Sequence, residues 1–489
     1  MNASPTVWFD VEDLFHHFRS GVSRLTGIQR LTFEIYRAAA SADDHAGGVR
    51  FVHHGRTGGP PLVPTTWERI EALHQAAQRA SPPPKRGGGR DRRSRSRGLR
   101  TSQVSFAAAA QPILAHVALT EVRAIASLGR FGLALSLYQA RSLGQVAKRM
   151  PLQLANLARL APASAMRHSS AFSRRSFEAE ARPGDVLLTL GSPWFCEDYA
   201  RIASWARNAR RLRFGIFIHD MVPMNHPEWC DMGVVRTFRA WHDSVVPFCD
   251  LVLTNSRHTA REVEEWAART GLRLARPARP MPIGTGFAGE PAGGALPAGL
   301  PEARTYVLFV STLEARKNHA LLVRVWRALL DEERSGQRPR DSVPDLVFAG
   351  RVGWLVSDLV QQLENAAWLE GRVRLILGPT DAELRALYEG CLFSLFPSWH
   401  EGWGLPVTEA QALGVPVLCS STSALPEAGG TLARYFDPGD TASCRRAVAR
   451  LLDHPEELAA WRADVRSRFE PTPWSVTARA VLEAAWSLA

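Results

Sequence analysis

Two glutamates frame a glycine-containing loop in the segment EGWGLPVTE, residues 401–409. Glu401 opens the loop, and Glu409 follows after seven intervening residues. Backbone N–H groups of residues 402–405, at the start of a helix, would favour an anion such as a diphosphate. Carboxylates beside that anion are better placed to accept hydrogen bonds from neutral hydroxyls, and the vicinal diols of sugars and riboses offer two at once. The pattern predicts a nucleotide-sugar site.

The flanking sequence predicts the elements that position this loop. Residues Leu392 to Phe396 are typical of a buried strand, Pro406 suits the first turn of a helix, and Pro416 to Cys419 resemble a second buried strand. Such a unit belongs to a parallel sheet, whose ligands lie beyond the carboxyl ends of the strands. The spacing alone also allows a solvated Glu401 and a Glu409 that only complements the helix dipole.

The segment PSWHEGWGLPVTEAQALGVPV resembles the E-x7-E region of retaining glycosyltransferases of the GT-B fold, family 4 in particular. The resemblance implies that Glu401 holds donor-sugar hydroxyls and that Glu409 holds the ribose. It also implies a donor-binding role for the loop residues Gly402, Trp403, Gly404 and Leu405.

A basic pair precedes a helix in STLEARKNHALLVRVWRALL, where Arg316 and Lys317 follow a predicted strand. Guanidinium and ammonium groups there can neutralise a leaving diphosphate. The segment is similar to the family's E-x-R-K-N element. Many relatives carry a further Arg about six residues before the Lys, and Ser311 stands in that place here. Arg316 is therefore the candidate substitute.

His219 and Asp220 end another predicted strand, in GIFIHDMVPMNHPEW. The carboxyl end of a strand is where an α/β domain presents functional groups, and the resemblance implies that a histidine here reaches the donor sugar. The alternative is a hydrogen-bonded histidine that only closes the strand.

Near the start of the chain, TGIQR resembles the first glycine loop of a bacterial family 4 subgroup that includes many mannosyltransferases. The resemblance places Gly27 near the donor diphosphate, and the alternative is that Gly27 only begins a helix. Residues 10–13, Asp-Val-Glu-Asp, are acidic enough to suggest a metal site. Because they follow the first strand, acceptor contact or solvation is expected instead, and no metal site is predicted.

The predicted fold is α/β of the GT-B type, with two Rossmann-like domains whose parallel sheets face each other across a cleft. The N-terminal, acceptor-side domain takes residues 1–287 with an insertion at about 80–182, and 288–303 form a linker. The C-terminal, nucleotide-sugar-binding domain takes 304–472, and a helix in 473–489 packs back on the first domain. Further strands are predicted at Val7–Phe9, 51–54, Val186–Leu190, Phe214–Ile218, Leu251–Thr254, Tyr306–Val310, Leu346–Ala349, Val373–Ile376 and Tyr435–Phe436.

The positive charge is concentrated in the insertion. The 489 residues carry a formal net charge of +11. Residues 82–182 alone hold 18 Lys and Arg against four acidic residues, so the remainder is slightly acidic. The low-complexity stretch 82–100 is expected to be disordered, and 105–160 to be helical. Basic, partly amphipathic segments bind anionic membranes, so peripheral contact through 82–182 is one expectation and a solvated linker is the other.

Six scattered cysteines form no C-x-x-C pair and are expected to be reduced. Neither a basic-then-apolar leader nor an apolar run of bilayer length is recognised. The expected location is the cytoplasm, and the periphery of the inner membrane is the expected site of any membrane contact.

The resemblance implies a retaining, metal-independent glycosyltransferase that moves a hexose from a nucleotide-sugar to a glycan or lipid-linked saccharide. Such a reaction would belong to the synthesis of cell-surface polysaccharide and needs no cofactor. The TGIQR subgroup favours mannose and GDP-mannose as the donor. The alternative is an arginine-rich RNA-binding protein on the same scaffold, suggested by RDRRSRSRGLR. Nucleic acid is not the expected partner, because that segment lacks interleaved aromatic residues.

Overall fold

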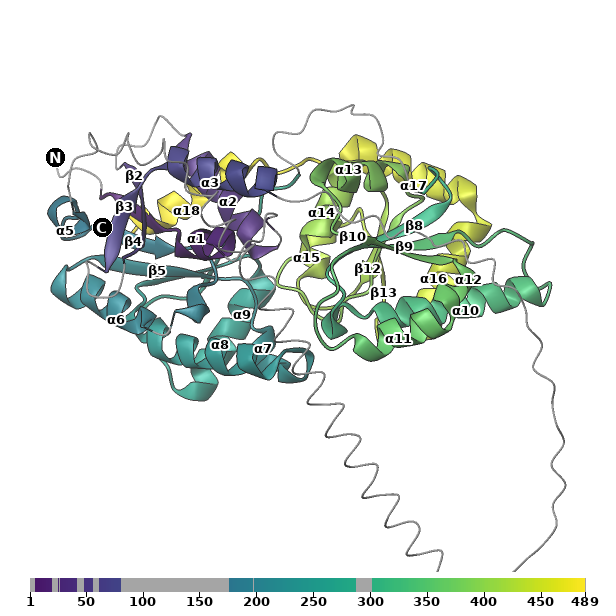
Figure 1. Ribbon diagram of the computed structural model, residues 1–489, viewed down its shortest axis with the longest axis horizontal. Coiled ribbons are helices and arrows are strands. Elements are labelled where there is room, and N and C mark those ends of the chain that lie inside the picture. Colours follow the sequence, from purple (N-terminus) through teal and green to yellow (C-terminus); the bar gives the residue numbers. More distant parts are fainter. Residues whose placement is uncertain are drawn as a thin grey trace, which may run out of the picture. The chain divides into compact units, whose positions relative to one another are not determined.

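The computed structural model describes residues 5–19, 25, 27–41, 48–55, 61–80, 176–196, 198–286 and 301–488 (Figure 1). All of them belong to one compact unit, Met1–Pro84 with Arg175–Ala489. The predicted basic insertion, with its 82–100 stretch and its helices, lies outside the described residues except at its end. Most of the predicted linker 288–303 lies outside them as well.

The first sheet has seven strands in the order β3-β2-β1-β4-β5-β6-β7. Neighbouring strands are parallel except for β3, which pairs antiparallel with β2 at the edge. The strands are β1 Val7–Asp10, β2 Val49–His54, β3 Leu62–Thr65, β4 Val186–Thr189, β5 Arg213–Ile218, β6 Leu251–Thr254 and β7 Arg279–Pro280. The helices of this region are α1 Glu12–Arg19, α2 Ile28–Ala40, α3 Trp67–Ala80, α5 Phe177–Glu180, α6 Tyr199–Ser204, α7 Val222–Asn225, α8 Met232–Val245 and α9 Arg257–Thr270.

The second sheet has six parallel strands in the order β10-β9-β8-β11-β12-β13. The strands are β8 Tyr306–Val310, β9 Asp345–Gly350, β10 Val373–Leu377, β11 Ser394–Phe396, β12 Val417–Ser420 and β13 Arg434–Phe436. The helices are α10 His319–Arg334, α11 Ser357–Asn365, α12 Ala367–Glu370, α13 Asp381–Gly390, α14 Leu405–Ala412, α15 Leu425–Gly429, α16 Thr441–Asp453, α17 Pro455–Arg468 and α18 Trp474–Trp486.

Both sheets follow the Rossmann order, in which the strand sequence reverses beside the first strand of the domain. The predicted α/β architecture with two Rossmann-like domains of GT-B type is therefore confirmed. The predicted strands are all present, with bounds within about two residues, although β11 begins at Ser394 instead of Leu392. The short edge strands β3 and β7 were not predicted.

Alternate residues of the first sheet enter two separate apolar cores. Val7 and Phe9 of β1 pack in one core, and Trp8 between them packs in the other. A strand that is apolar on both faces must be covered on both, which is why helices lie on either side of this sheet in Figure 1. The second sheet is enclosed by a single core in which Trp326 of α10 is fully buried.

The last helix, α18, packs on the first sheet although it follows the second sheet in sequence. It contacts α2 and three strands of that sheet, and in Figure 1 the yellow α18 lies beside the purple α2. Val481 and Leu482 are fully buried there, in the same core as Phe9. The chain thus returns to its first domain before it ends.

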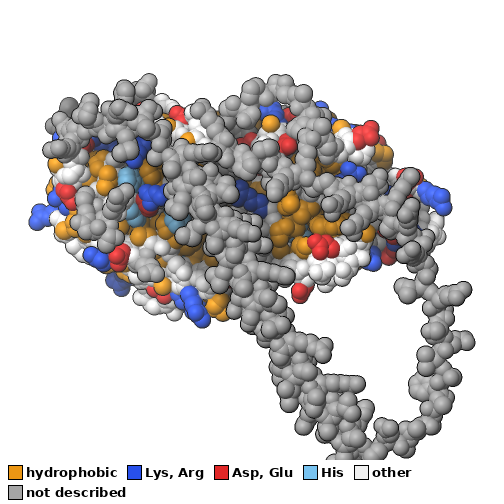
Figure 2. Space-filling view, viewed as in Figure 1, with side chains coloured by type: hydrophobic (Ala, Val, Ile, Leu, Met, Phe, Trp, Pro, Cys, Tyr) orange, Lys and Arg blue, Asp and Glu red, His pale blue; other side chains and the backbone are white. Residues whose placement is uncertain are grey.

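No helix within the described ranges is long and apolar enough to cross a membrane. On the face seen in Figure 2, basic and acidic side chains are interspersed with apolar ones over the described surface. The six cysteines are free thiols.

The packing of α18 predicts a large loss of stability when its buried face is truncated. Leu482→Ala should lower the free energy of unfolding by about 2–5 kcal/mol, because it leaves a cavity in the first domain's core. The matched change Arg479→Ala, at an exposed position of the same helix, should stay within about 0.5 kcal/mol. Denaturant unfolding followed by circular dichroism measures both, and equal midpoints would contradict the packing argument.

Candidate active site

One cavity of about 610 Å³ is lined by residues from both domains. Its walls include the segments that follow β1, β5, β8 and β11, at the carboxyl ends of these strands. The residues predicted for the site all line it: Gly27, His219, Asp220, Arg316, Lys317, Glu401, Gly402, Trp403, Gly404, Leu405 and Glu409. Their predicted roles remain predictions, but their common location is a property of the fold.

Glu401 is buried and paired with both members of the basic pair. Arg316 Nη1 lies 2.7 Å from Glu401 Oε2, and Lys317 Nζ lies 2.6 Å from Oε1. Although burial raises the pKa of Glu401, the two cations outweigh it and lower this pKa to about 2. The carboxylate is therefore ionised near neutral pH, and Glu401 is not the solvated group that spacing alone allowed.

The strand order brings these three residues together. Because β8 and β11 are neighbours, the turn after β8 and the loop after β11 meet at one edge of the sheet. Trp399 N donates to Arg316 O at 3.0 Å, and Arg316 Nη1 donates to His400 O at 2.9 Å. Ser311, which stands where many relatives have an arginine, faces His319 Nε2 at 3.2 Å and lines the cavity.

Glu409, in the first turns of α14, is paired with a cation of the first domain. Arg30 Nη1 lies 3.1 Å from Glu409 Oε1, and Tyr388 Oη donates to Oε2 at 3.4 Å. Burial raises the pKa of Glu409, and Arg30 partly offsets this effect. The carboxylate therefore does more than complement the dipole of α14. Sequence reasoning missed Arg30, although it is the last residue of the TGIQR segment.

The glycine loop contacts the first domain so closely that a side chain would not fit. A Cβ on Gly402 would lie 1.8 Å from His219 O, far inside van der Waals contact. Gly404, the residue before α14, has a φ of 111°, which L residues rarely adopt. Trp403 between them packs against the core of the first domain. Gly27, which precedes α2 at a φ of 52°, lines the opposite wall.

His219 both closes its strand and reaches the cavity. Its Nε2–H donates to Leu190 O at 2.7 Å, and burial lowers the pKa of His219 to about 4. The imidazole is therefore neutral near pH 7, which leaves Nδ1 as an acceptor. Asp220 accepts a hydrogen bond from Val222 N at 3.1 Å and holds the start of α7.

Asp10, which ends β1, and the following Glu12 and Asp13 are buried. Of the two expectations for this acidic run, solvation was wrong, and acceptor contact stays a prediction. Asp10 accepts hydrogen bonds from Tyr199 Oη at 2.6 Å and His54 Nε2 at 2.9 Å. Burial disfavours the charged imidazole, but the facing Asp10 carboxylate raises the pKa of His54 to about 10. The partners come from distant parts of the chain, and they compensate the desolvation of these charges.

Asp13 lines the cavity and differs from the paired carboxylates. No side chain within the described residues donates a hydrogen bond to it. Burial, followed by the charge of Asp10, raises the pKa of Asp13 to about 7. A Cβ on Gly191 would lie 1.9 Å from Asp13 Oδ2, so a larger residue there would displace the Asp13 carboxylate. Sequence reasoning gave no role to Gly191, and it considered Asp13 only as part of the acidic run at 10–13.

The raised pKa of Asp13 predicts how stability depends on pH. The folded chain holds this proton up to about pH 7, whereas the unfolded chain releases it near its ordinary value of 3.8. The contribution of Asp13 to stability should therefore fall as pH rises from about 4 to about 7. Asp13→Asn should remove that loss and unfold at a higher temperature than the parent at pH 8, with little difference at pH 4.

The exposed Asp358→Asn provides the matched control for the loss of one carboxylate. Thermal unfolding at both pH values measures the effect. A parent and an Asp13→Asn variant whose melting temperatures change in parallel with pH would contradict it.

Residues 297–468 match the family model of the Glycosyl transferases group 1. The chain is 35% identical to O-antigen chain mannosyltransferase B of Escherichia coli over 159 residues, which are 32% of this chain and 40% of that protein. It is 25% identical to the serotype-specific mannosyltransferase WbdA of Escherichia coli over 268 residues, 53% of this chain and 31% of that protein. These matches therefore span less than half the length of either mannosyltransferase.

Among solved structures, a UDP-forming α,α-trehalose-phosphate synthase from Burkholderia xenovorans is similar with a TM-score of 0.48 and 16% identity. The similarity covers 63% of this chain and 75% of that one.

Proposed function

We propose that this chain is a retaining glycosyltransferase that moves a hexose, with mannose favoured, from a nucleotide-sugar to a glycan or lipid-linked saccharide. The observation that carries the proposal is the single cavity in which Glu401 lies between Arg316 and Lys317, with Glu409 beside Arg30. The match of residues 297–468 to glycosyl transferases supports the reaction class. The mannosyltransferases among the relatives support mannose and a role in cell-surface polysaccharide synthesis.

The basic pair and the start of α14 suit a leaving nucleoside diphosphate. Arg316 and Lys317 line the cavity, and so do Gly404, Leu405 and Pro406 at the amino end of α14. Donors fixed in a buried site stabilise negative charge that develops as the bond breaks, without reorganising solvent. The donor therefore needs no divalent cation at its phosphates and no organic cofactor.

The two carboxylates suit hydroxyl groups on either side of that diphosphate. Each oxygen of a carboxylate can accept about two hydrogen bonds, and Glu401 uses both of its oxygens for cations. Lone pairs remain on each oxygen for the hydroxyls of the transferred sugar. Glu409, on the first-domain side of α14, takes the ribose, and neutral His219 accepts a hydrogen bond from the sugar through Nδ1.

Membrane contact through residues 82–182 and a cytoplasmic location remain predictions, because those residues lie outside the described part of the chain. A lipid-linked acceptor would give such peripheral contact a purpose.

Donor binding and turnover should separate when the two glutamates are changed. Glu409→Gln should weaken GDP-mannose binding about tenfold or more, whereas Glu401→Gln should chiefly lower turnover because it misplaces the sugar. The exposed Glu364→Gln serves as control. Thermal shift against GDP-, UDP- and dTDP-sugars identifies the donor, since a ligand at 100 times its Kd stabilises by about 2.7 kcal/mol. Parental kinetics in both variants would refute the assigned roles.

The transferred sugar should keep its anomeric configuration. NMR of the product from an α-linked donor should show an α linkage, and added Mg²⁺ or Mn²⁺ should not raise the rate, because Arg316 and Lys317 supply the positive charge. A β-linked product would contradict retention. A rate that requires Mn²⁺ would contradict the assignment of the basic pair.

A further inference from the structure

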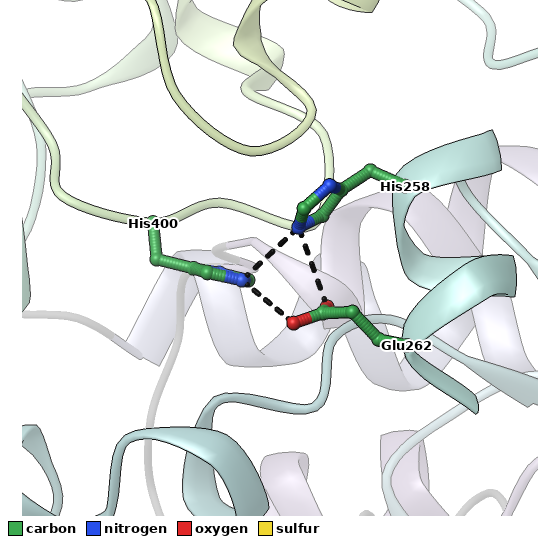
Figure 3. A group of neighbouring side chains, drawn as sticks. All are labelled: His258, Glu262 and His400. Carbon is green, nitrogen blue, oxygen red and sulfur yellow. Dashed lines mark hydrogen bonds and ion pairs between the residues drawn. The ribbon is translucent and has the colours of Figure 1, made fainter. Parts of the chain in front are cut away.

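Three side chains from two distant segments converge on one point (Figure 3), and none of the three lines the 610 Å³ cavity. His258 and Glu262 are one turn apart on α9, so they project from the same face of that helix. His400 comes from the loop between β11 and α14, directly before Glu401. One potential ligand atom from each of the three residues lies within 4.8 Å of the others.

The group is enclosed and close-packed. The side chains of Glu262 and His400 are 10% and 7% exposed, and that of His258 is 25% exposed. His400 Nε2 lies 2.9 Å from Glu262 Oε1 and 3.3 Å from His258 Nε2. His258 Nε2 lies 3.7 Å from Glu262 Oε2, and this buried oxygen has no hydrogen bond within the described residues.

Hydrogen bonds among the three side chains cannot satisfy both Nε2 atoms and both carboxylate oxygens at once. Each imidazole nitrogen carries at most one proton, yet each Nε2 faces both the other imidazole and the carboxylate. If His400 Nε2–H donates to Oε1, the distance from His258 to Oε2 is too long for a second good hydrogen bond. A cation at the centre would instead accept one lone pair from each of the three groups.

The spacing fits tetrahedral zinc. Zn–N bonds of about 2.0–2.1 Å place two nitrogens about 3.3–3.4 Å apart in a tetrahedral site. The two Nε2 atoms are 3.3 Å apart, and each lies within 3.7 Å of one carboxylate oxygen, since His400 Nε2 is 2.9 Å from Glu262 Oε1 and His258 Nε2 is 3.7 Å from Oε2. Two histidines and one carboxylate also form a common ligand set for zinc, with the fourth position open to water.

A second layer of hydrogen bonds orients the carboxylate. Asn225 Nδ2 donates to Glu262 Oε1 at 2.8 Å, and Arg269 Nη2 donates to Asn225 Oδ1 at 2.9 Å. Outer contacts of this kind fix the ligands of metal sites. They also leave Oε2 as the oxygen free to turn toward the two imidazoles.

We propose that His258, Glu262 and His400 bind a zinc ion that ties α9 to the loop carrying Glu401. The same junction is held by Glu427, which accepts hydrogen bonds from Arg257 N at 2.9 Å and His258 N at 2.8 Å. The zinc fixes the position of the Glu401 loop against the first domain, and it takes no part in the departure of the diphosphate. This zinc site is additional to the proposed function, in which no metal binds the phosphates of the donor.

Zinc binding to the full chain, purified metal-free and without a polyhistidine tag, tests the proposal. Competition with a chromophoric chelator should give one zinc per chain, whereas Mg²⁺ should not compete. His258→Ala and Glu262→Gln should each weaken zinc binding about tenfold or more. The matched control His454→Ala, at an exposed histidine outside the cluster, should bind zinc as the parent does.

A second readout, with Co²⁺ as the probe, keeps the outcome decisive. Co²⁺ in place of zinc should give the intense visible absorption of a tetrahedral site, and His258→Ala should lose it. Because the His258 side chain is a quarter exposed, this variant keeps the test valid if Glu262→Gln fails to fold. Absence of saturable zinc binding by the parent, or equal affinity in His258→Ala, would overturn the proposal. Neither readout uses a sugar donor, so failure here is distinct from failure of the proposed transferase activity.

Discussion

Glu401 is held between Arg316 and Lys317 inside the cavity, and the arrangement of the site depends on this buried ionic group. Removing charges from water costs several kcal/mol for each ion, so each must keep a partner. The partners come from the loops after two neighbouring strands, β8 and β11. The Rossmann strand order places those two loops side by side, and each buried charge therefore has a partner of opposite charge.

Contacts with the first domain also hold the glycine loop in place. Arg30 compensates the buried Glu409, and Gly402 allows the backbone of the loop to approach His219 O. An ion pair and a close backbone contact thus hold opposite ends of the segment 401–409. The segment that carries both glutamates is consequently positioned by the two domains together, with α14 as its rigid part.

Much of the fold followed from the sequence because its signals are local. Buried strands such as Leu251–Thr254 and Tyr306–Val310 are continuous apolar runs, and they were predicted with their correct bounds. The short edge strands β3 and β7 carry no such run and were missed. The GT-B architecture came from a resemblance in residues 397–417 and not from periodicity.

The site was predictable in its members but not in its pairings. The eleven expected residues line one cavity, yet Arg30 received no role, because Gly27 was the one residue of the TGIQR segment to which a role was given. Asp10 and Asp13 were expected to contact the acceptor or to be solvated, and their burial was not predicted because their partners, such as Tyr199 for Asp10, are far away in sequence. Long-range charge compensation leaves no periodic signal, so sequence patterns cannot reveal it.

The pairing of Glu401 has a consequence for the order of events in the proposed reaction. Arg316 and Lys317 are the cations assigned to the diphosphate, and they already neutralise Glu401. A diphosphate that takes over some of their N–H groups would weaken both bonds to Glu401, so the remaining lone pairs of this carboxylate would accept hydrogen bonds from sugar hydroxyls more strongly. Phosphate binding and sugar placement are then coupled through one carboxylate, because the same two cations cannot fully satisfy both anions. A free hexose without its diphosphate would meet a Glu401 whose bonds to both cations are intact and whose lone pairs are weaker acceptors, so the site favours the intact donor over its sugar alone.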